Sequence, residues 1–119
     1  MIYIASALYQ EALPWIEQYQ LKKRTELTKF QIFEGTVKTA AQESLTVRLV
    51  ITGTGPLAAA SACTYLCTLF EPGAGAVFIN FGIAAKIAGK GGIGETFIVH
   101  KMTGVSSKKQ YYPDRSEER

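Results

Sequence analysis

The hydrophobic pattern of the first 20 residues changes period once. Residues 2–7 form a short, mostly apolar run without a charged side chain. Because exposed edge strands are usually marked by charges, this run predicts a central β-strand. Residues 8–19 follow a helical period instead, with Ala12, Ile16 and Tyr19 on one face. The sequence therefore predicts a strand that leads into a helix with almost no loop.

The rest of the chain alternates between strand-like and helix-like segments. The predicted elements are strands at residues 30–37 and 45–51, a helix at 57–70, and strands at 76–81 and 96–99. Pro56 suits the first position of the second helix. Residues 21–28 and the glycine-rich residues 89–94 are predicted connections, and residues 104–119 a polar tail.

Apolar strands separated by helices favour an α/β fold in which helices sandwich the sheet. The chain has 119 residues, 47% hydrophobic and 19% charged, which fits one globular domain over residues 1–119. No apolar run approaches the roughly 18 residues of a membrane span. Residues 1–5 lack a basic leader. We therefore expect a cytoplasmic protein that binds no membrane.

Charge and cysteine content exclude several other classes of function. The net charge is +3, but the basic residues occur in short groups at 22–24 and 108–109, with acidic residues nearby. This pattern predicts solvated patches and no nucleic-acid partner. Two cysteines and one histidine predict neither a disulfide framework nor a metal site. Cys63 and Cys67 are interpreted as small core residues, and His100 as an exposed side chain.

Candidate chemistry lies where the predicted strands end, because open α/β sheets bind ligands at their carboxyl ends. Three such ends, at residues 6–8, 52–55 and 80–84, are small or contain glycine. The first leads to Glu11 at a helix N-terminus. Glu11 can complement the helix dipole, or it can act as a general base that activates water.

Two glycine-rich loops raise the alternative of a nucleotide site. Gly53, Gly55 and Ala58 fit the spacing of a dinucleotide fingerprint, but no acidic residue closes the next strand. Residues 89–92 do not form a phosphate-binding loop of the Walker type, since Gly91 follows Lys90 where a serine or threonine is needed. Both loops are interpreted as turns, and no cofactor is expected.

Four motifs in order resemble the purine nucleoside phosphorylase and nucleosidase superfamily, most closely the methylthioadenosine/S-adenosylhomocysteine nucleosidases. Residues 2–11 resemble that family's opening strand and Gly-Ala-Met-Glu-Glu-Glu segment. Residues 52–59, Thr-Gly-Thr-Gly-Pro-Leu-Ala-Ala, resemble Ser-Gly-Ile-Gly-Lys-Val-Ala-Ala. Residues 80–85 are similar to Asn-Thr-Gly-Ser-Ala-Gly-Gly, and residues 94–99 to Gly-Asp-Ile-Val-Val.

The resemblance implies a three-layer sandwich around a central mixed sheet and hydrolysis of the N-ribosidic bond of a 5′-substituted adenosine. Glu11 matches the glutamate that activates the water, and Thr52 matches a serine near it. Ala7 and Leu8 match residues that line the substrate site. We expect one cleft that is lined by Glu11, Thr52, Gly53 and Gly82.

Departures from the family pattern leave two alternatives. The phosphate-binding arginines of the phosphorylases have no counterpart in residues 5–9 or 78–81, which favours hydrolysis over the alternative, a nucleoside phosphorylase. Residues 106–119 resemble neither the family's Met-Glu ribose clamp nor its purine-protonating aspartate. The chain therefore resembles an N-terminal half. The second alternative is a degenerate domain that binds a nucleoside or only assembles, without activity.

The same resemblance implies a homodimer or larger assembly. The apolar helix predicted at residues 57–70 is the candidate interface, because large exposed apolar patches usually mark association. Residues 111–113, Tyr-Tyr-Pro, are a candidate segment for donation to a neighbouring subunit's site.

Overall fold

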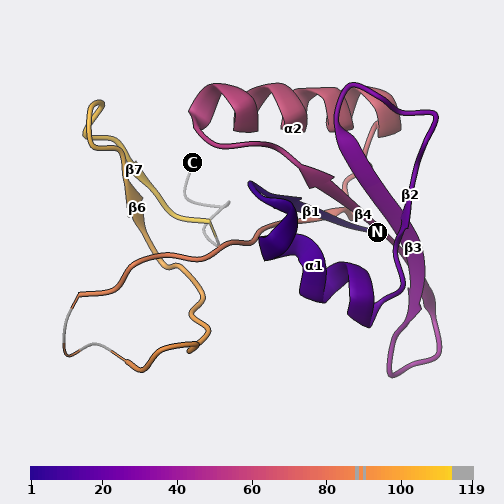
Figure 1. Ribbon diagram of the computed structural model, residues 1–119, viewed down its shortest axis with the longest axis horizontal. Coiled ribbons are helices and arrows are strands. Elements are labelled where there is room, and N and C mark those ends of the chain that lie inside the picture. The colour runs from indigo at the N-terminus through magenta and orange to yellow at the C-terminus, as the bar shows by residue number, and fades with distance from the viewer. Residues whose placement is uncertain (88, 90, 114–119) are drawn as a thin grey trace. The chain divides into compact units, whose positions relative to one another are not determined.

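The computed structural model describes residues 1–87, 89 and 91–113. The chain divides into two compact units, Met1–Ala84 and Ala85–Arg119 (Figure 1). The first unit holds both helices and a five-stranded sheet, and the second holds a short hairpin.

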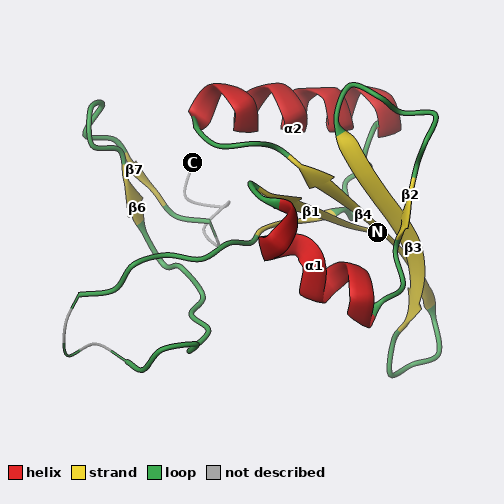
Figure 2. Cartoon of the chain, viewed as in Figure 1, coloured by secondary structure: helices red, strands yellow, loops and turns green. Residues whose placement is uncertain are grey.

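The sheet of the first unit is mixed, as predicted, with the strand order β2-β3-β4-β1-β5 (Figure 2). Strand β1 pairs in parallel with β4 and β5, whereas β3 is antiparallel to both β2 and β4. The prediction that the N-terminal run is a central strand is therefore confirmed. The strand bounds are β1 Ile2–Ser6, β2 Lys22–Lys23, β3 Gln31–Lys38, β4 Ser44–Ile51 and β5 Val77–Asn80.

Helices α1 (Tyr9–Gln18) and α2 (Pro56–Phe70) pack on opposite faces of this sheet (Figure 1). The buried face of α1 packs with Ile4, and that of α2 packs with the neighbouring Tyr3. Consecutive strand residues point to opposite faces, so β1 contributes to both cores. The α/β class and the two predicted helices are confirmed. The buried helical residues are Ala12 and Ile16 in α1, and Ala62 and Leu66 in α2.

Helix α2 carries no charged residue, yet only two of its side chains are buried. Cys67 is exposed and Cys63 is half-buried. The prediction that both cysteines are core residues is wrong. The core face of the helix is defined by Ala62 and Leu66, and the cysteines lie one position further round the helix from these two residues.

The second unit departs most from the expected pattern. The predicted strand at residues 96–99 is wrong, because this segment has no regular structure. Its apolar side chains, including Phe97 and Ile98, are 67% and 88% exposed. Strand β6 (Met102–Thr103) instead pairs with β7 (Gln110–Tyr111). Strand β7 lies inside the segment that was expected to be a polar tail. Residues 114–119 of that tail lie outside the described residues.

Candidate functional site

The carboxyl ends of β4, β1 and β5 lie side by side, as the expected site requires. Beyond the last ladder pair of β1 and β4, the Thr52 N–H donates to the Ser6 carbonyl at 2.8 Å. The Gly53 N–H then donates to the Ala7 carbonyl at 3.0 Å. These two hydrogen bonds extend the pairing past the strands and hold the glycine loop against the start of α1.

A buried hydroxyl joins the other side of β1 to β5. The Ser6 side chain is 1% exposed, and its Oγ donates to the Phe81 carbonyl at 2.9 Å. Ser6 was not among the predicted site residues. The available signal was a polar residue at the end of an otherwise apolar strand, which in a buried position needs a hydrogen-bond partner.

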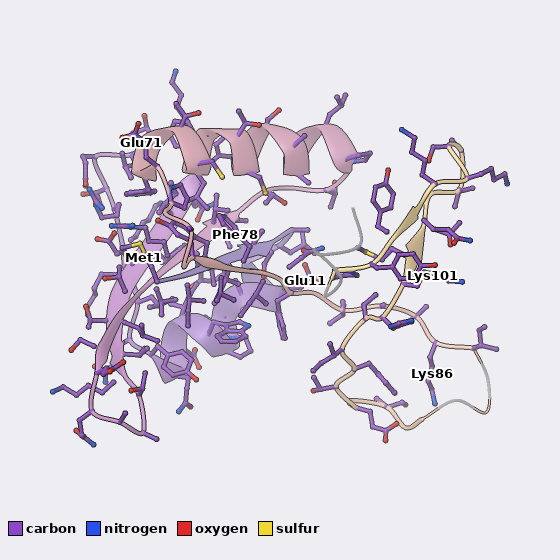
Figure 3. All side chains as sticks on the ribbon, turned by 180° about the vertical axis from the view of Figure 1, so that it is seen from behind. Met1, Glu11, Glu71, Phe78, Lys86 and Lys101 are labelled. Atoms are coloured by element: carbon purple, nitrogen blue, oxygen red, sulfur yellow. The ribbon has the colours of Figure 1, made fainter. Side chains whose placement is uncertain are left out.

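Glu11 lies at the third position of α1, and its carboxylate has two backbone partners. Its Oε1 accepts a hydrogen bond from the Leu8 N–H at 3.1 Å, and its Oε2 accepts one from the Ile83 N–H at 2.9 Å. Figure 3 shows Glu11 beside the segment that leaves β5. Glu11 therefore caps its own helix and also binds the chain beyond the end of β5.

Gly82 makes this close approach possible. A Cβ atom at position 82 would lie 3.0 Å from Oε2 of Glu11. The absence of a side chain thus lets the carboxylate reach the next backbone N–H. An ionised carboxylate offers about four acceptor positions. Among the described residues Glu11 has two hydrogen-bond partners, so about two acceptor positions are left for a water molecule or a ligand hydroxyl.

Thr52 is 8% exposed, and its hydroxyl donates to the Gly53 carbonyl at 2.7 Å. Gly53 and Gly55 have φ angles of 84° and 95°, which favour glycine. This loop leads directly into the first turn of α2. Among the described residues, no hydrogen bond joins Glu11 to Thr52 or Gly53.

The predicted site residues therefore form two contact groups at one end of the sheet. Glu11 and Gly82 make the first, and Ala7, Thr52 and Gly53 make the second. Leu8, at the N-cap of α1, is 47% exposed. In the sequence it lies between Ala7 of the second group and Glu11 of the first.

A cavity of about 220 Å³ lies near the same end of the sheet, displaced toward β3. Gln31 lines it and pairs with Ile51, the last residue of β4. None of the predicted site residues lines this cavity. Its lining consists of Lys23, Thr25, Leu27, Thr28, Phe30 and Gln31.

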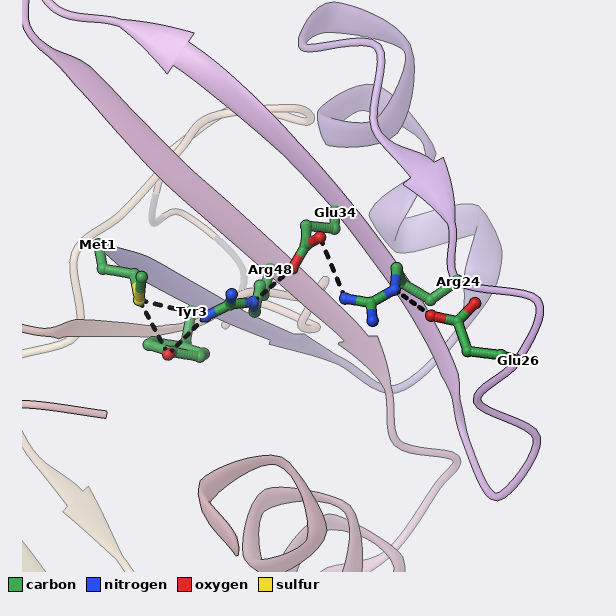
Figure 4. A network of polar contacts seen from close by, with 6 residues as sticks. All are labelled: Met1, Tyr3, Arg24, Glu26, Glu34 and Arg48. Atoms are coloured by element: carbon green, nitrogen blue, oxygen red, sulfur yellow. Dashed lines mark hydrogen bonds and ion pairs between the residues drawn. The ribbon is translucent and has the colours of Figure 1, made fainter. Parts of the chain in front are cut away.

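A charged network crosses the face of the sheet that α2 covers (Figure 4). Glu34 accepts from Arg24 Nη1 at 3.1 Å and from Arg48 Nε at 2.5 Å. The Arg48 guanidinium also lies 4.0 Å from the ring centroid of Phe70. Such cation–π contacts are worth about 0.5–2 kcal/mol. The network also includes Glu26, which pairs with Arg24 at 2.5 Å, so it holds two positive and two negative charges. It links β3, β4 and the residue after β2 to the end of α2.

The other motifs that the sequence raised lie in the second unit. His100 is exposed, as predicted, and its ring lies edge-on to Tyr112 at 5.7 Å. Lys90, in the glycine-rich loop, lies outside the described residues.

Neither helix is long and apolar enough to cross a membrane, among the residues that the structure describes. A scan against protein-family models and a search of curated proteins found no match to this chain. The resemblance to the nucleosidases therefore depends on the four sequence motifs alone, and the fourth, at residues 94–99, does not form the strand expected there.

Proposed function

We propose that the first unit is a purine nucleosidase-like domain, with the two helical layers and central sheet of a nucleoside phosphorylase-like sandwich. Its substrate class is a 5′-substituted adenosine, bound at the carboxyl ends of β1, β4 and β5. The single observation that carries this proposal is the position of Glu11, whose carboxylate binds the Ile83 N–H beside Gly82.

In the proposed reaction, a water oxygen attacks the anomeric carbon of the ribose. Glu11 accepts the proton that the water loses. The bond between that carbon and the purine nitrogen breaks, and the purine leaves with a proton supplied by an acid. General base catalysis of this kind typically contributes about 10²–10⁴-fold. The backbone N–H groups of Leu8 and Ile83 hold the carboxylate in one orientation for this step.

The chain supplies a candidate for the water-activating step only. Residues 106–119 resemble neither the family's ribose clamp nor its purine-protonating aspartate. We therefore propose that this chain binds the nucleoside and releases little or no adenine by itself. Loss of leaving-group protonation costs about 10²–10⁴-fold, and loss of ribose positioning adds to that.

Phosphorolysis is the less favoured reaction. A phosphate nucleophile needs cationic, bidentate donors, and arginine is the usual one. Ser6 and Phe81, at the strand ends where the phosphorylases place such groups, are instead joined to each other by a hydrogen bond.

Methylthioadenosine titrated into the purified chain, followed by calorimetry, tests the binding proposal. Glu11→Gln replaces one of the two acceptor oxygens by an NH₂ group, which cannot accept a hydrogen bond from a backbone N–H. We expect the affinity for methylthioadenosine to fall at least about tenfold, or about 1.4 kcal/mol in binding free energy. Glu17→Gln is the matched control, because Glu17 is exposed at the other end of the same helix. Absence of binding at millimolar nucleoside, or equal effects of the two variants, would reject the proposal.

Adenine release measured on the same samples tests the second part. We expect release no faster than in buffer. Sustained release that Glu11→Gln abolishes would mean that this chain holds a complete hydrolytic site, including an acid that protonates the leaving purine.

A further inference from the structure

Cys63 and Cys67 are free thiols one helical turn apart on α2. Residues four apart in a helix lie on the same side, with Cβ atoms about 5–6 Å apart. The core face of α2 is formed by other residues, Ala62 and Leu66. The two sulfurs therefore form a neighbouring pair on a helix surface that does not use them for core packing.

The spacing of this pair does not suit a disulfide. A disulfide needs Cβ atoms about 3.5–4.5 Å apart, which is shorter than the helical separation. A metal ion between the sulfurs replaces the single S–S bond by two metal–sulfur bonds. Each such bond is about 2.3 Å long in zinc thiolates, so the bridge is longer. The helix can accommodate that longer bridge without changing its backbone.

We propose that Cys63 and Cys67 form a two-thiolate binding site for a soft, monovalent metal ion of the Cu(I) type. Binding replaces two S–H bonds by two metal–sulfur bonds and releases two protons, with no change in oxidation state.

The ligand count selects this class of ion. Structural zinc takes four protein ligands, and catalytic zinc takes three. Within the described part of the chain, no group of three or more histidine, cysteine, aspartate or glutamate side chains could hold a metal ion. Thiolates favour soft ions such as Cu(I) over hard ones. A pair of thiolates alone therefore suits an ion of low coordination number.

The surroundings of the pair agree with this assignment. Helix α2 has no charged side chain that would compete for the ion or for the thiolates.

Anaerobic titration of the full chain with Cu(I), against a coloured Cu(I) chelator, tests the proposal. Outer-shell partners alone change metal affinity by about 10–100-fold. Loss of a direct ligand should cost more, so Cys63→Ser and Cys67→Ser should each bind Cu(I) at least about 100-fold more weakly. Circular dichroism on every variant checks that the helices remain.

A register-shifted variant is the matched control. Combining Ser61→Cys with Cys67→Ser keeps two cysteines on α2, but residues two apart do not face each other. We expect this variant to bind Cu(I) as weakly as the single variants. Affinity equal to that of the unmodified chain, in this variant or in a single one, would overturn the two-thiolate site.

Phenylarsine oxide provides a second measurement that does not depend on copper. Two facing thiols displace the arsenic-bound oxygen as water and form two As–S bonds, which mass spectrometry detects. The adduct of the unmodified chain should survive excess glutathione, a monothiol, whereas that of the register-shifted variant should not. Loss of the adduct from the unmodified chain under these conditions would contradict the proposal.

Discussion

The carboxylate of Glu11 accepts a hydrogen bond from the backbone N–H of Ile83, 72 residues further along the chain, at 2.9 Å. This contact joins the first turn of α1 to the segment that follows β5. Because Oε1 of the same carboxylate caps the helix through Leu8, one side chain fixes both segments. Whatever chemistry Glu11 performs, its position depends on two backbone donors from opposite ends of the first unit.

Glu11→Ala should lower the free energy of unfolding by about 1 kcal/mol, because it removes the partner of two backbone N–H groups. The Ile83 amide should then exchange with deuterium faster than in the unmodified chain. Hydrogen exchange measured residue by residue checks this prediction. Glu17→Ala, at an exposed position of the same helix, should leave the Ile83 amide unchanged. Equal acceleration by both variants would indicate general loosening of α1.

Gly35→Ala should destabilise the first unit by about 1–3 kcal/mol through overpacking. A Cβ at this position would lie 2.8 Å from Cδ2 of Leu21, a side chain that is 5% exposed and has little room to move. Gly73→Ala is the control, because no heavy atom lies within 4 Å of its added Cβ. We expect that variant to be neutral or slightly stabilised. Urea denaturation of both variants measures the difference.

The ion pair of Glu26 with Arg24 should make a pH-dependent contribution to stability. A hydrogen bond from the backbone N–H of Glu26, and then the Arg24 side chain, lower the pKa of Glu26 below its usual value of 4.5. A carboxyl group with a lowered pKa stabilises the fold above its unfolded pKa, and this contribution is lost as the pH falls through the folded value. Unfolding measured from neutral to acidic pH should thus show Glu26→Gln converging with the unmodified chain. A constant difference would contradict this.

The exposed surface of α2 should mediate the proposed self-association. Leu57 is 85% exposed on a helix without charged residues, and helices of this kind are usually covered. Leu57→Lys should weaken assembly at least about tenfold, or about 1.4 kcal/mol, in light scattering over a concentration series. Ala74→Lys adds the same charge at an exposed turn and should have no effect. A monomeric mass for the unmodified chain at micromolar concentration would exclude the assembly.

The sequence was sufficient for most of the first unit because local pattern and tertiary environment agree there. An uncharged run predicted the central position of β1, and helical periodicity predicted α1. Residues 96–99 have the same composition as a strand, but β-propensity reflects packing against neighbouring strands. Among the described residues of the second unit these four pair with no strand, and Phe97 is 67% exposed. The pattern alone could not reveal that absence.

The position of the candidate residues at one end of the sheet was predictable, whereas their contacts were not. Gly53 and Gly82 follow strands that were predicted to be parallel neighbours, and ligands bind at the carboxyl ends of such strands. Both glycines were therefore expected at one end of the sheet. The hydrogen bond between Glu11 and Ile83 depends on two residues far apart in sequence, and no local pattern encodes it. The cysteines were misassigned because an apolar helix does not indicate which of its faces is buried.

The central position of β1 has a consequence for the order in which the protein is made. Residues Ile2–Ser6 are synthesised well before their two partners, β4 and β5, which begin at Ser44 and Val77. A nascent chain must therefore carry an apolar strand with both edges unsatisfied until most of the first unit has left the ribosome. Pairing between residues so distant in sequence is slow, and exposed strand edges promote aggregation meanwhile. In a cell, recovery of folded protein should depend on how well chaperones shield strand β1 during translation.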